Sequence, residues 1–586
     1  MNLAAIFHQS TDNFCYPLDA DNLTINLLTG YDVERVFLHW GDPFDSMHFD
    51  RPWSWCGERQ EIVLQKRLPH HRWWSAVVQP RCKRCAYFFE LHTSDEIYYY
   101  LEDGFYKQDD FSFTDHRLLC FFFPWMNRAD IAYTPDWVQD TVWYQIFPER
   151  FCNGDPSRNP EGVRPWQKGP VRNSEFYGGD LRGIIQKLDY LQKLGVTGLY
   201  FTPIFASTTS HKYNTTDYFR IDPAFGDEAT LHELVDTAHQ KGIRIMLDGV
   251  FNHCGDEFPQ WQDVLQHGPQ SPYFDWFMVN QWPFDTTDPS TKDGKFYSFA
   301  YAAFMPKLNT NNPAVIDYLV GICEYWVRNF GIDGLRLDVA DEVSHQFCRT
   351  LRQRMKQLNP NLYILGEIWQ NSMPWLRGDE FDSVMNYPLK NAIAQFWLDK
   401  SQTAADFEHA VNVCYTAYPQ QINRVLFNLL DSHDTDRLIT RTGSLDVFYQ
   451  QLAVLYTMPG CPCVYYGTEI ALEGGPDPDC RRCMPWDDID AGLYDDRIEL
   501  LHTLMHLRKT EPLFKAETLC FPDEPSSGRV ITYYKKAPNA QLEIILNAEQ
   551  NPISVDESGT VLFARLLENG TLAPGGVLIR KQTLSV

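Results

Sequence analysis

The strongest constraint on the fold is a long alternation of short apolar runs with segments of helical length. Apolar runs of strand length lie at 198–201, 243–247, 334–337, 362–365, 384–386, 425–430 and 463–466. Segments of helical pattern lie between them, at 181–194, 230–241, 315–330 and 345–358. Alternating strands and helices form a parallel sheet with helices outside it, and eight such units close a (β/α)8 TIM barrel. The sequence therefore predicts an α/β protein whose barrel spans 126–510.

Three further regions differ from this alternation. Residues 1–125 contain short apolar strands separated by polar or Gly/Pro turns, at 26–28, 36–40, 61–64, 73–78, 86–91 and 96–101, which is typical of a β-sandwich. The segment 255–312 is too long for a loop after the third strand and predicts a small inserted domain. Apolar runs at 530–534, 542–546, 561–567 and 576–579 predict a C-terminal antiparallel β-sandwich over 511–586.

The composition limits which partners the protein can bind and in which compartment it is expected. A formal charge of −26 argues against binding to nucleic acid. No apolar stretch reaches the roughly 18 residues of a membrane span, and the first residues lack the pattern of a signal peptide. An odd number of cysteines, 15, fits reduced thiols better than a disulfide framework, so we expect a cytoplasmic protein. Aromatic residues make up 15% of the chain, which favours flat stacking surfaces for a ligand such as a sugar.

Polar residues follow several of the apolar runs, where a barrel places its catalytic side chains. Asp248 ends the run at 243–247, Asp338 the run at 334–337 and Glu367 the run at 362–365, while His433 and Asp434 follow 425–430. A single carboxylate at a strand end is often only a helix cap or half of an ion pair. Coincidence is a much weaker explanation for the whole set at successive strand ends, which includes the three carboxylates Asp338, Glu367 and Asp434, an arginine two residues before Asp338, and the two histidines His253 and His433.

This set of residues suits the cleavage of a glycosidic bond. That reaction requires one ionised and one protonated carboxyl group on either side of an oxocarbenium-like transition state. Asp338 and Glu367 can face each other across a sugar if their strands are neighbours. Arg336 lies two residues before Asp338 on the same face of its strand and would keep the Asp338 carboxylate ionised.

Four motifs in this order resemble the α-amylase family of glycoside hydrolases: Asp248 to His253, Gly334 to Asp338, Gly366 to Trp369 and Leu430 to Asp434. The resemblance is closer to the branch that contains cyclomaltodextrinase, neopullulanase and maltogenic amylase. It rests on Met305 to Asn309, Gly178 to Leu181, Trp369 directly after Glu367 and Ile368, and Asp477 to Arg482. That branch also has an N-terminal sandwich, so the resemblance covers nearly the whole chain.

The resemblance implies a role for each motif residue. Asp338 resembles the nucleophile of a retaining mechanism, Glu367 the general acid and base, and Asp434 the carboxylate that stabilises the transition state. The implied substrate-binding residues are His253, Arg336, His433, Asp477, Arg481, Tyr213 and Trp369. The implied activity is hydrolysis of α-1,4 glucosidic bonds in cyclodextrins, short maltodextrins and pullulan, with some transglycosylation. The resemblance does not decide whether α-1,6 bonds are cleaved as well.

A calcium site is also implied, although one of its positions departs from the pattern. The residues Asn153, Asp155, Asn159, Gly178 and Asp180 resemble a calcium loop of some relatives, in which oxygen ligands surround the ion. Arg158 stands where an oxygen ligand is expected, and a guanidinium has no acceptor but carries a charge of its own. The sequence does not decide whether Ca²⁺ is bound, and it implies no organic cofactor.

Two other functions and one assembly remain open at this point. A glucosyltransferase or isomerase of the same family would pass the covalent sugar to another sugar, and Glu342 is placed where it could tune that choice. A non-catalytic carbohydrate-binding protein could use the same barrel, although such proteins usually lose a carboxylate. The resemblance also implies a homodimer in which an N-terminal domain covers the partner's site, which would make starch a poor substrate.

Overall fold

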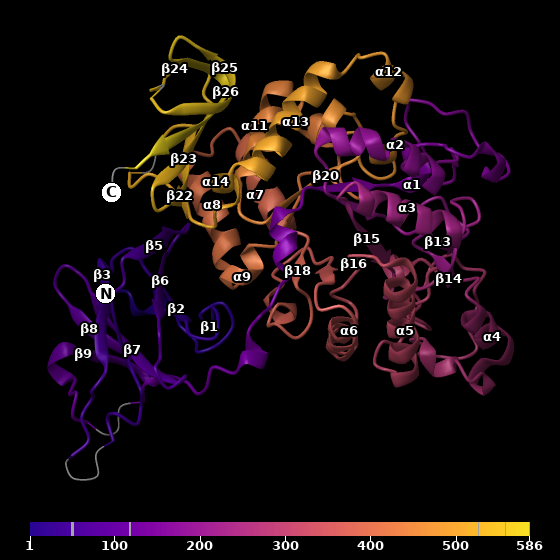
Figure 1. Cartoon of the computed structure of the whole chain (residues 1–586). Coiled ribbons are helices and arrows are strands. Elements are labelled where there is room, and N and C mark those ends of the chain that lie inside the picture. The colour runs from indigo at the N-terminus through magenta and orange to yellow at the C-terminus, as the bar shows by residue number, and fades with distance from the viewer. Residues whose placement is uncertain (48–51, 116–118, 525–526, 557, 585–586) are drawn as a thin grey trace. The chain divides into compact units, whose positions relative to one another are not determined.

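The computed structural model describes residues 1–47, 52–115, 119–524, 527–556 and 558–584. The described chain forms two compact units (Figure 1). Unit 1 contains Met1–Tyr133, Met373–Asp379 and Ser401–Asn423, and unit 2 contains Thr134–Ser372, Glu380–Lys400 and Arg424–Val586. Within the described parts of the chain, every helix is too short or too polar to cross a membrane.

Unit 2 is built on an eight-stranded parallel barrel. Its strands lie in the order β18-β17-β16-β15-β12-β11-β20-β19, and a parallel bridge between Met385 and Phe427 joins the two ends of this order. The strands are β11 (Trp143–Ile146), β12 (Gly198–Phe201), β15 (Arg244–Gly249), β16 (Gly334–Leu337), β17 (Tyr363–Gly366), β18 (Ser383–Val384), β19 (Phe427–Asn428) and β20 (Cys461–Tyr465). Large side chains such as Trp143, Tyr200 and Tyr363 fill the interior. The predicted TIM barrel is confirmed.

The strand β11 was absent from the pattern in the sequence. Its four residues, Trp-Tyr-Gln-Ile, contain a central glutamine and are too few to show a period. Each of its residues is nevertheless buried, because β11 pairs with β12 on one side and β20 on the other.

The helices on the outside follow the expected segments closely. The helix α2 (Leu181–Leu194) buries Ile184, Leu188 and Leu191 on one face, begins at the cap Asp180 and ends at Gly195, whose φ of 106° favours glycine. The other long helices are α3 (Glu228–Gln240), α5 (Pro313–Phe330), α6 (His345–Leu358), α7 (Tyr387–Leu398), α11 (Leu445–Thr457) and α13 (Asp495–Thr510).

Two excursions from the barrel bring residues toward its rim. A hairpin of β13 (Phe205–Ser207) and β14 (Thr215–Ile221) follows β12. The inserted domain follows the third barrel strand, β15, as predicted, and contains α4 (Pro259–His267) and several single bridges. Its core is aromatic, since Trp261 packs against Phe277, Phe284 and Phe296.

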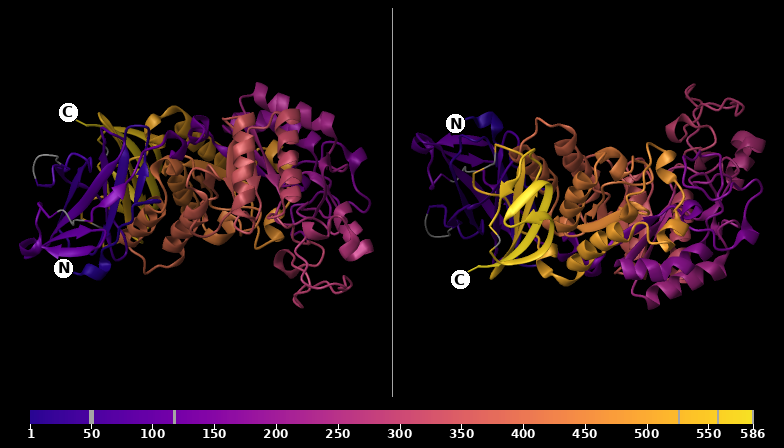
Figure 2. Two further views of the ribbon diagram at one scale, coloured as in Figure 1. Left: turned by 90° about the horizontal axis from the view of Figure 1, so that it is seen from below. Right: turned by 90° about the horizontal axis from the view of Figure 1, so that it is seen from above.

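The C-terminal part of unit 2 is antiparallel, as expected. Its strands are β21 (Leu519–Cys520), β22 (Val530–Ala537), β23 (Ala540–Asn547), β24 (Ile553–Ser554), β25 (Thr560–Glu568) and β26 (Thr571–Thr583). They join in one sheet of order β21-β22-β23-β26-β24, with β25 paired to β26. These strands are the yellow arrows of Figure 2.

Unit 1 is an antiparallel sandwich. One sheet has the order β1 (Cys15–Pro17), β2 (Leu23–Thr29), β6 (Arg72–Val78) and β5 (Leu64–Arg67). The other has β4 (Glu58–Glu61), β3 (Arg35–Gly41), β7 (Cys85–His92), β8 (Ile97–Leu101) and β9 (Gly104–Lys107), with β10 (Phe121–Phe123) paired to β7. Side chains of both sheets, among them Ile25, Trp74 and Phe89, share one core. The helix α8 (Ala404–Thr416) also belongs to this unit, and its Glu408 pairs with Arg67 at 2.7 Å.

Candidate active site

A cavity of about 510 Å³ opens where the barrel strands β16 and β17 end. This volume lies in the usual range of small-molecule sites. The cavity is lined by Asn173, His211, Tyr213, His253, Phe299, Phe304, Met305, Asp338, Val339, Asp341, Glu342, Glu367, Trp369, His433, Asp434, Asp477 and Arg481. The structure therefore brings together nine of the ten predicted catalytic and substrate-binding residues in one wall. The tenth, Arg336, is fully buried and contacts two of them.

Arg336 connects three carboxylates. Its Nη1 donates to both oxygens of Asp248 at 2.9 Å and to Oδ1 of Asp338 at 2.9 Å. Its Nη2 lies 2.7 Å from Oε2 of Glu367. The strand pairing produces this arrangement, because Arg336 on β16 lies opposite Asp248 on β15, and Asp338 and Glu367 follow directly after the neighbouring strands β16 and β17.

One guanidinium cannot neutralise three buried carboxylates. Burial raises the pKa of Asp338 well above its ordinary value; Arg336 acts in the opposite direction, and the charges of Glu367 and Asp248 raise this pKa further. Arg336 therefore does not by itself keep Asp338 ionised, as the sequence suggested, because burial and the two neighbouring carboxylates outweigh its charge. Since one guanidinium carries one positive charge against three carboxylates, the arrangement favours a proton on one carboxyl group of the site, and glycosidic cleavage needs one protonated and one ionised carboxyl group.

The backbone after Asp338 is bent so that it binds Glu367. Val339 has a φ of 45°, a conformation that is strained for a β-branched residue. Its N–H donates to Oε2 of Glu367 at 3.1 Å, and Nε1 of Trp369 donates to Oε1 at 3.2 Å. Arg336 and Val339 thus hold Oε2 of Glu367, while Oε1 is held only by the longer hydrogen bond from Trp369 and is the oxygen that can carry a transferable proton.

A second group forms around Asp434. His433 Nε2 lies 3.0 Å from Oδ2 of Asp434, and Arg481 holds Oδ1 of Asp434 at 3.1 Å and Oδ1 of Asp477 at 2.9 Å. Although burial raises the pKa of Asp434, the hydrogen bond from Nε2 of His433 and the charge of Arg481 outweigh burial and lower this pKa below its ordinary value. Asp434 is therefore ionised and, with its side chain 31% exposed, can accept hydrogen bonds from sugar hydroxyls.

Aromatic and imidazole rings shape the wall of the cavity. Tyr213 stacks on His433 at an interplanar angle of 8°. Burial lowers the pKa of His253 to about 3, and its Nε2 is buried without a hydrogen-bond partner among the described residues. One face of Trp369 packs on Tyr387 at 3.7 Å, yet Trp369 remains 38% exposed. An unpartnered imidazole nitrogen and an exposed indole face both suit a sugar ligand.

Several residues of the cavity lie outside the motifs that identified the site in the sequence. Phe299 and Phe304 come from the inserted domain, and Phe299 stacks on His253 with ring centroids 4.8 Å apart. Asn173 comes from a long loop and accepts a hydrogen bond from Arg481 at 3.2 Å. His211 precedes Tyr213 by two residues, so the aromatic motif around Tyr213 was the one available pointer to it.

The two carboxylates of the predicted calcium loop are already engaged. Asp180 caps α2 and accepts hydrogen bonds from the backbone N–H groups of Gly154, Asp155 and Gly183, at 2.6 to 3.2 Å. The Asp155 carboxylate accepts a hydrogen bond from the hydroxyl of Ser157 at 2.6 Å and lies 3.3 Å from Nε of Arg158.

The neutral members of this loop contact one another. Nδ2 of Asn153 donates to Oδ1 of Asn159 at 2.9 Å, and a side chain at Gly178 would collide with both amides. Oδ1 of Asn153 is buried without a partner among the described residues. Within the described part of the chain, no group of three or more His, Cys, Asp or Glu is arranged to hold a metal. A single unpartnered oxygen does not fit a calcium ion, which takes six to eight oxygens.

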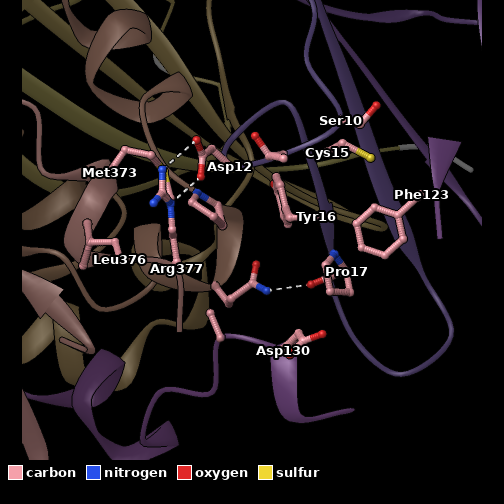
Figure 3. A pocket seen from close by; sticks show the side chains of 14 residues that line it. Ser10, Asp12, Cys15, Tyr16, Pro17, Phe123, Asp130, Met373, Leu376 and Arg377 are labelled. Atoms are coloured by element: carbon pink, nitrogen blue, oxygen red, sulfur yellow. Dashed lines mark hydrogen bonds and ion pairs between the residues drawn. The ribbon is translucent and has the colours of Figure 1, made fainter. Parts of the chain in front are cut away.

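Unit 1 contains a separate pocket of about 460 Å³ (Figure 3). Tyr16, Phe123 and Asp12 lie on its wall, and the Asp12 carboxylate accepts two hydrogen bonds from Arg377, at 2.7 and 3.2 Å. Its second carboxylate, Asp130, is exposed and accepts a hydrogen bond from Asn127 at 3.0 Å. In this pocket the described hydrogen bonds of Arg377 go to Asp12, whereas in the cavity of unit 2 one arginine holds both Asp338 and Glu367.

Comparisons with known proteins agree with this geometry. The family description "Alpha amylase, catalytic domain" matches residues 145–510, and "Alpha amylase, N-terminal ig-like domain" matches residues 1–126. The chain is 44% identical to a cyclomaltodextrinase of Geobacillus thermopakistaniensis, over 95% of this chain and 94% of the relative. It is 41% identical to neopullulanase 2 of Thermoactinomyces vulgaris, over 87% and 86%. A solved cyclomaltodextrinase structure has a TM-score of 0.88 and 37% identity, over 100% of this chain and 98% of that one.

Proposed function

The chain belongs to the α-amylase family of glycoside hydrolases, and we propose that it cleaves α-1,4 glucosidic bonds in cyclodextrins, short maltodextrins and pullulan. The observation that carries this proposal is Arg336, whose guanidinium bonds to both Asp338 and Glu367 at the wall of one cavity. The names of the relatives support the substrate class.

The proposed reaction has two steps. In the first, a carboxylate oxygen of Asp338 attacks the anomeric carbon while Glu367 gives its proton to the leaving glycosidic oxygen, which leaves a covalent glycosyl enzyme. In the second, Glu367 takes a proton from water, and the water oxygen displaces Asp338. Two displacements at the same carbon retain the anomeric configuration.

The other residues of the cavity act on the sugar without bonding to it covalently. Asp434, His433 and His253 present an ionised acceptor and two imidazoles to the hydroxyl groups of the cleaved sugar, above the ring of Tyr213. Arg481 holds Asp434 and Asp477 in place, and the open face of Trp369 stacks on the sugar of the leaving side.

A substrate panel tests this function. The protein is incubated with β-cyclodextrin, maltotriose and pullulan, and the released sugars are identified; products from pullulan also show whether α-1,6 bonds are cleaved. We expect the Asp338→Asn variant to lose at least about 10⁴-fold in kcat, because an amide is not a nucleophile. Asp317→Asn, an exposed aspartate on α5, is the matched control and should keep full activity. If the wild type releases no sugar from any of the three substrates, the proposal is overturned.

Transfer of the sugar to a second sugar is the alternative outcome of the same intermediate. Glu342 lies on the cavity wall, and its carboxylate pairs with Lys307 at 3.0 Å. A charged pair at this point can hold either water or an acceptor hydroxyl. Quantifying oligosaccharides longer than the substrate separates transfer from hydrolysis.

We propose further that Arg158 takes the place of a structural calcium ion. Its guanidinium lies between two carboxylates, with Nε 3.3 Å from Asp155 and Nη2 2.7 Å from Asp227. Asp227 caps α3 and Asp180 caps α2, so Arg158 links the starts of two barrel helices through the loop at Asp155. A fixed cation of the chain can stabilise this junction without an ion.

The proposed assembly is a homodimer in the cytoplasm. Unit 1 exposes several large apolar side chains, including Phe44, Val63, Leu119 and Trp125, which are 47% to 82% exposed. A protein partner that covered these side chains would remove their apolar area from water. The odd number of cysteines, 15, supports a reducing compartment.

A further inference from the structure

Gln145 is a buried polar residue whose side chain contacts a residue of the active site. It lies on β11, is 1% exposed, and does not line the cavity. Its amide nitrogen Nε2 lies 2.7 Å from Nδ1 of His433. Any influence of Gln145 on a bound sugar must therefore pass through the imidazole of His433.

The contacts of His433 determine where its proton lies. Nε2 of His433 faces Oδ2 of Asp434 at 3.0 Å and the hydroxyl oxygen of Tyr213 at 2.5 Å. The hydroxyl hydrogen of Tyr213 is donated to Oδ2 of Asp248 at 3.1 Å, so its oxygen accepts from His433. Two acceptors around Nε2 require a hydrogen on that atom.

The other ring nitrogen is fixed by Gln145. The amide nitrogen of glutamine is a donor only, so Nδ1 of His433 must offer its lone pair. An imidazole with a hydrogen on Nε2 and a lone pair on Nδ1 is neutral. A carboxylate at position 145 would instead accept a hydrogen from Nδ1 and favour the imidazolium.

We propose that Gln145 is a positioning residue that keeps His433 neutral, with its single proton on Nε2 directed into the cavity between Tyr213 and Asp434. This inference rests on the proposed function, since it assigns His433 a role toward the sugar at the point of cleavage.

The charge of His433 matters because the transition state is itself positive. Around His433 the charged and titratable groups are Asp434, Asp477, Arg481, Cys480, Tyr213, His211, Asp248 and Arg336. Two arginines already lie in this set. A further cation on His433 would oppose the developing charge and would bind the Asp434 carboxylate more tightly, which withdraws it from the sugar hydroxyls.

The kinetic test compares two variants of different character. Gln145→Glu has the same shape but favours the imidazolium, so we expect kcat to fall roughly 10- to 100-fold at pH 6, with recovery as the pH rises and the imidazolium loses its proton. Gln145→Leu removes the donor without adding charge, so its loss should be similar at every pH. Gln192→Glu, an exposed change on α2, is the control and should keep the wild-type profile.

A measurement independent of activity follows the proton itself. Histidine labelled with ¹⁵N reports the tautomer by NMR, and the signal of His433 is identified by its loss in His433→Asn. We expect the neutral form with hydrogen on Nε2 in the wild type at pH 7, and the imidazolium in Gln145→Glu at the same pH. Thermal unfolding of each variant confirms that it is folded.

The outcomes distinguish this inference from the proposed function. Wild-type protein that is inactive on the substrate panel overturns the function, while the NMR result still decides the state of His433. An imidazolium or a hydrogen on Nδ1 in the wild type overturns the inference. So does a Gln145→Glu enzyme whose pH profile and kcat match those of the wild type within about twofold.

Discussion

Single residues in the active site are held at a cost in stability. The buried carboxylates of Asp338, Glu367 and Asp248 share one guanidinium, and this excess of negative charge is useful to a nucleophile but unfavourable to folding. Active sites commonly contain such conflicts, because the chemistry needs groups that the fold alone would not select.

Removing the charge of Asp338 should therefore stabilise the protein. The pKa of Asp338 is raised in the folded state, so its favourable contribution is present below the unfolded pKa, about 3.9, and is lost as the pH rises through the folded pKa. Asp338→Asn does not titrate. We expect its midpoint of thermal unfolding to exceed that of the wild type by a few degrees at pH 8 and by less at pH 5.

Differential scanning calorimetry at the two pH values checks this expectation, with Asp317→Asn as the control for the chemical change. An Asp338→Asn midpoint at pH 8 equal to or below the wild-type value would show that the hydrogen bond from Arg336 outweighs the buried charge.

At the scale of elements, the loops that leave the barrel strands decide what surrounds the site. The hairpin after β12 supplies Tyr213, and the inserted domain after β15 supplies Phe299 and Phe304. The loop that begins at Asn153 leads back to the cap of α2, because the backbone of Gly154 and Asp155 binds the Asp180 carboxylate. A change in this loop should thus act on stability before it acts on catalysis.

The role proposed for Arg158 gives a prediction at this scale. Neither EDTA nor millimolar CaCl₂ should change the thermal midpoint of the wild type. Arg158→Asn restores an oxygen where the guanidinium stands, so its thermal midpoint should fall without calcium and rise when calcium is added. At a concentration 100 times Kd, calcium should add about 2.7 kcal/mol to the free energy of unfolding.

Arg158→Ala is the matched control, because it removes the cation without supplying an oxygen, and calcium should not rescue it. A wild-type midpoint that drops in EDTA and recovers in calcium would contradict the proposal.

At the scale of the whole molecule, the chain combines an enzyme unit with a sandwich unit that has its own core. The exposed apolar side chains of unit 1 are the basis for the proposed dimer. We expect sedimentation equilibrium to give a mass about twice the 68.2 kDa of one chain.

Dilution should then link assembly to specificity. If a partner's N-terminal domain limits access to the site, the ratio of cyclodextrin to starch cleavage should fall as the dimer dissociates. A monomer that still prefers cyclodextrin to starch would contradict this role of the sandwich.

Much of this architecture could be predicted from the sequence. The ends of α2 and α6 coincide with the predicted segments, because their caps and apolar faces are local features. The predicted positions of Asp338 and Glu367 at neighbouring strand ends agree with the structure. Their roles, and the boundaries of the domains as predicted, remain predictions that the experiments above address.

The sequence by itself determined the barrel, its two flanking β-domains and the carboxylates at the strand ends, because periodicity, caps and motifs depend only on residues that are close in the sequence. Only the tertiary structure decided that one arginine serves three carboxylates, that Phe299 lies on His253, and that Gln145 reaches His433. These contacts join residues up to 288 positions apart. Their physical reason is the closure of the barrel, which places strands distant in the sequence side by side.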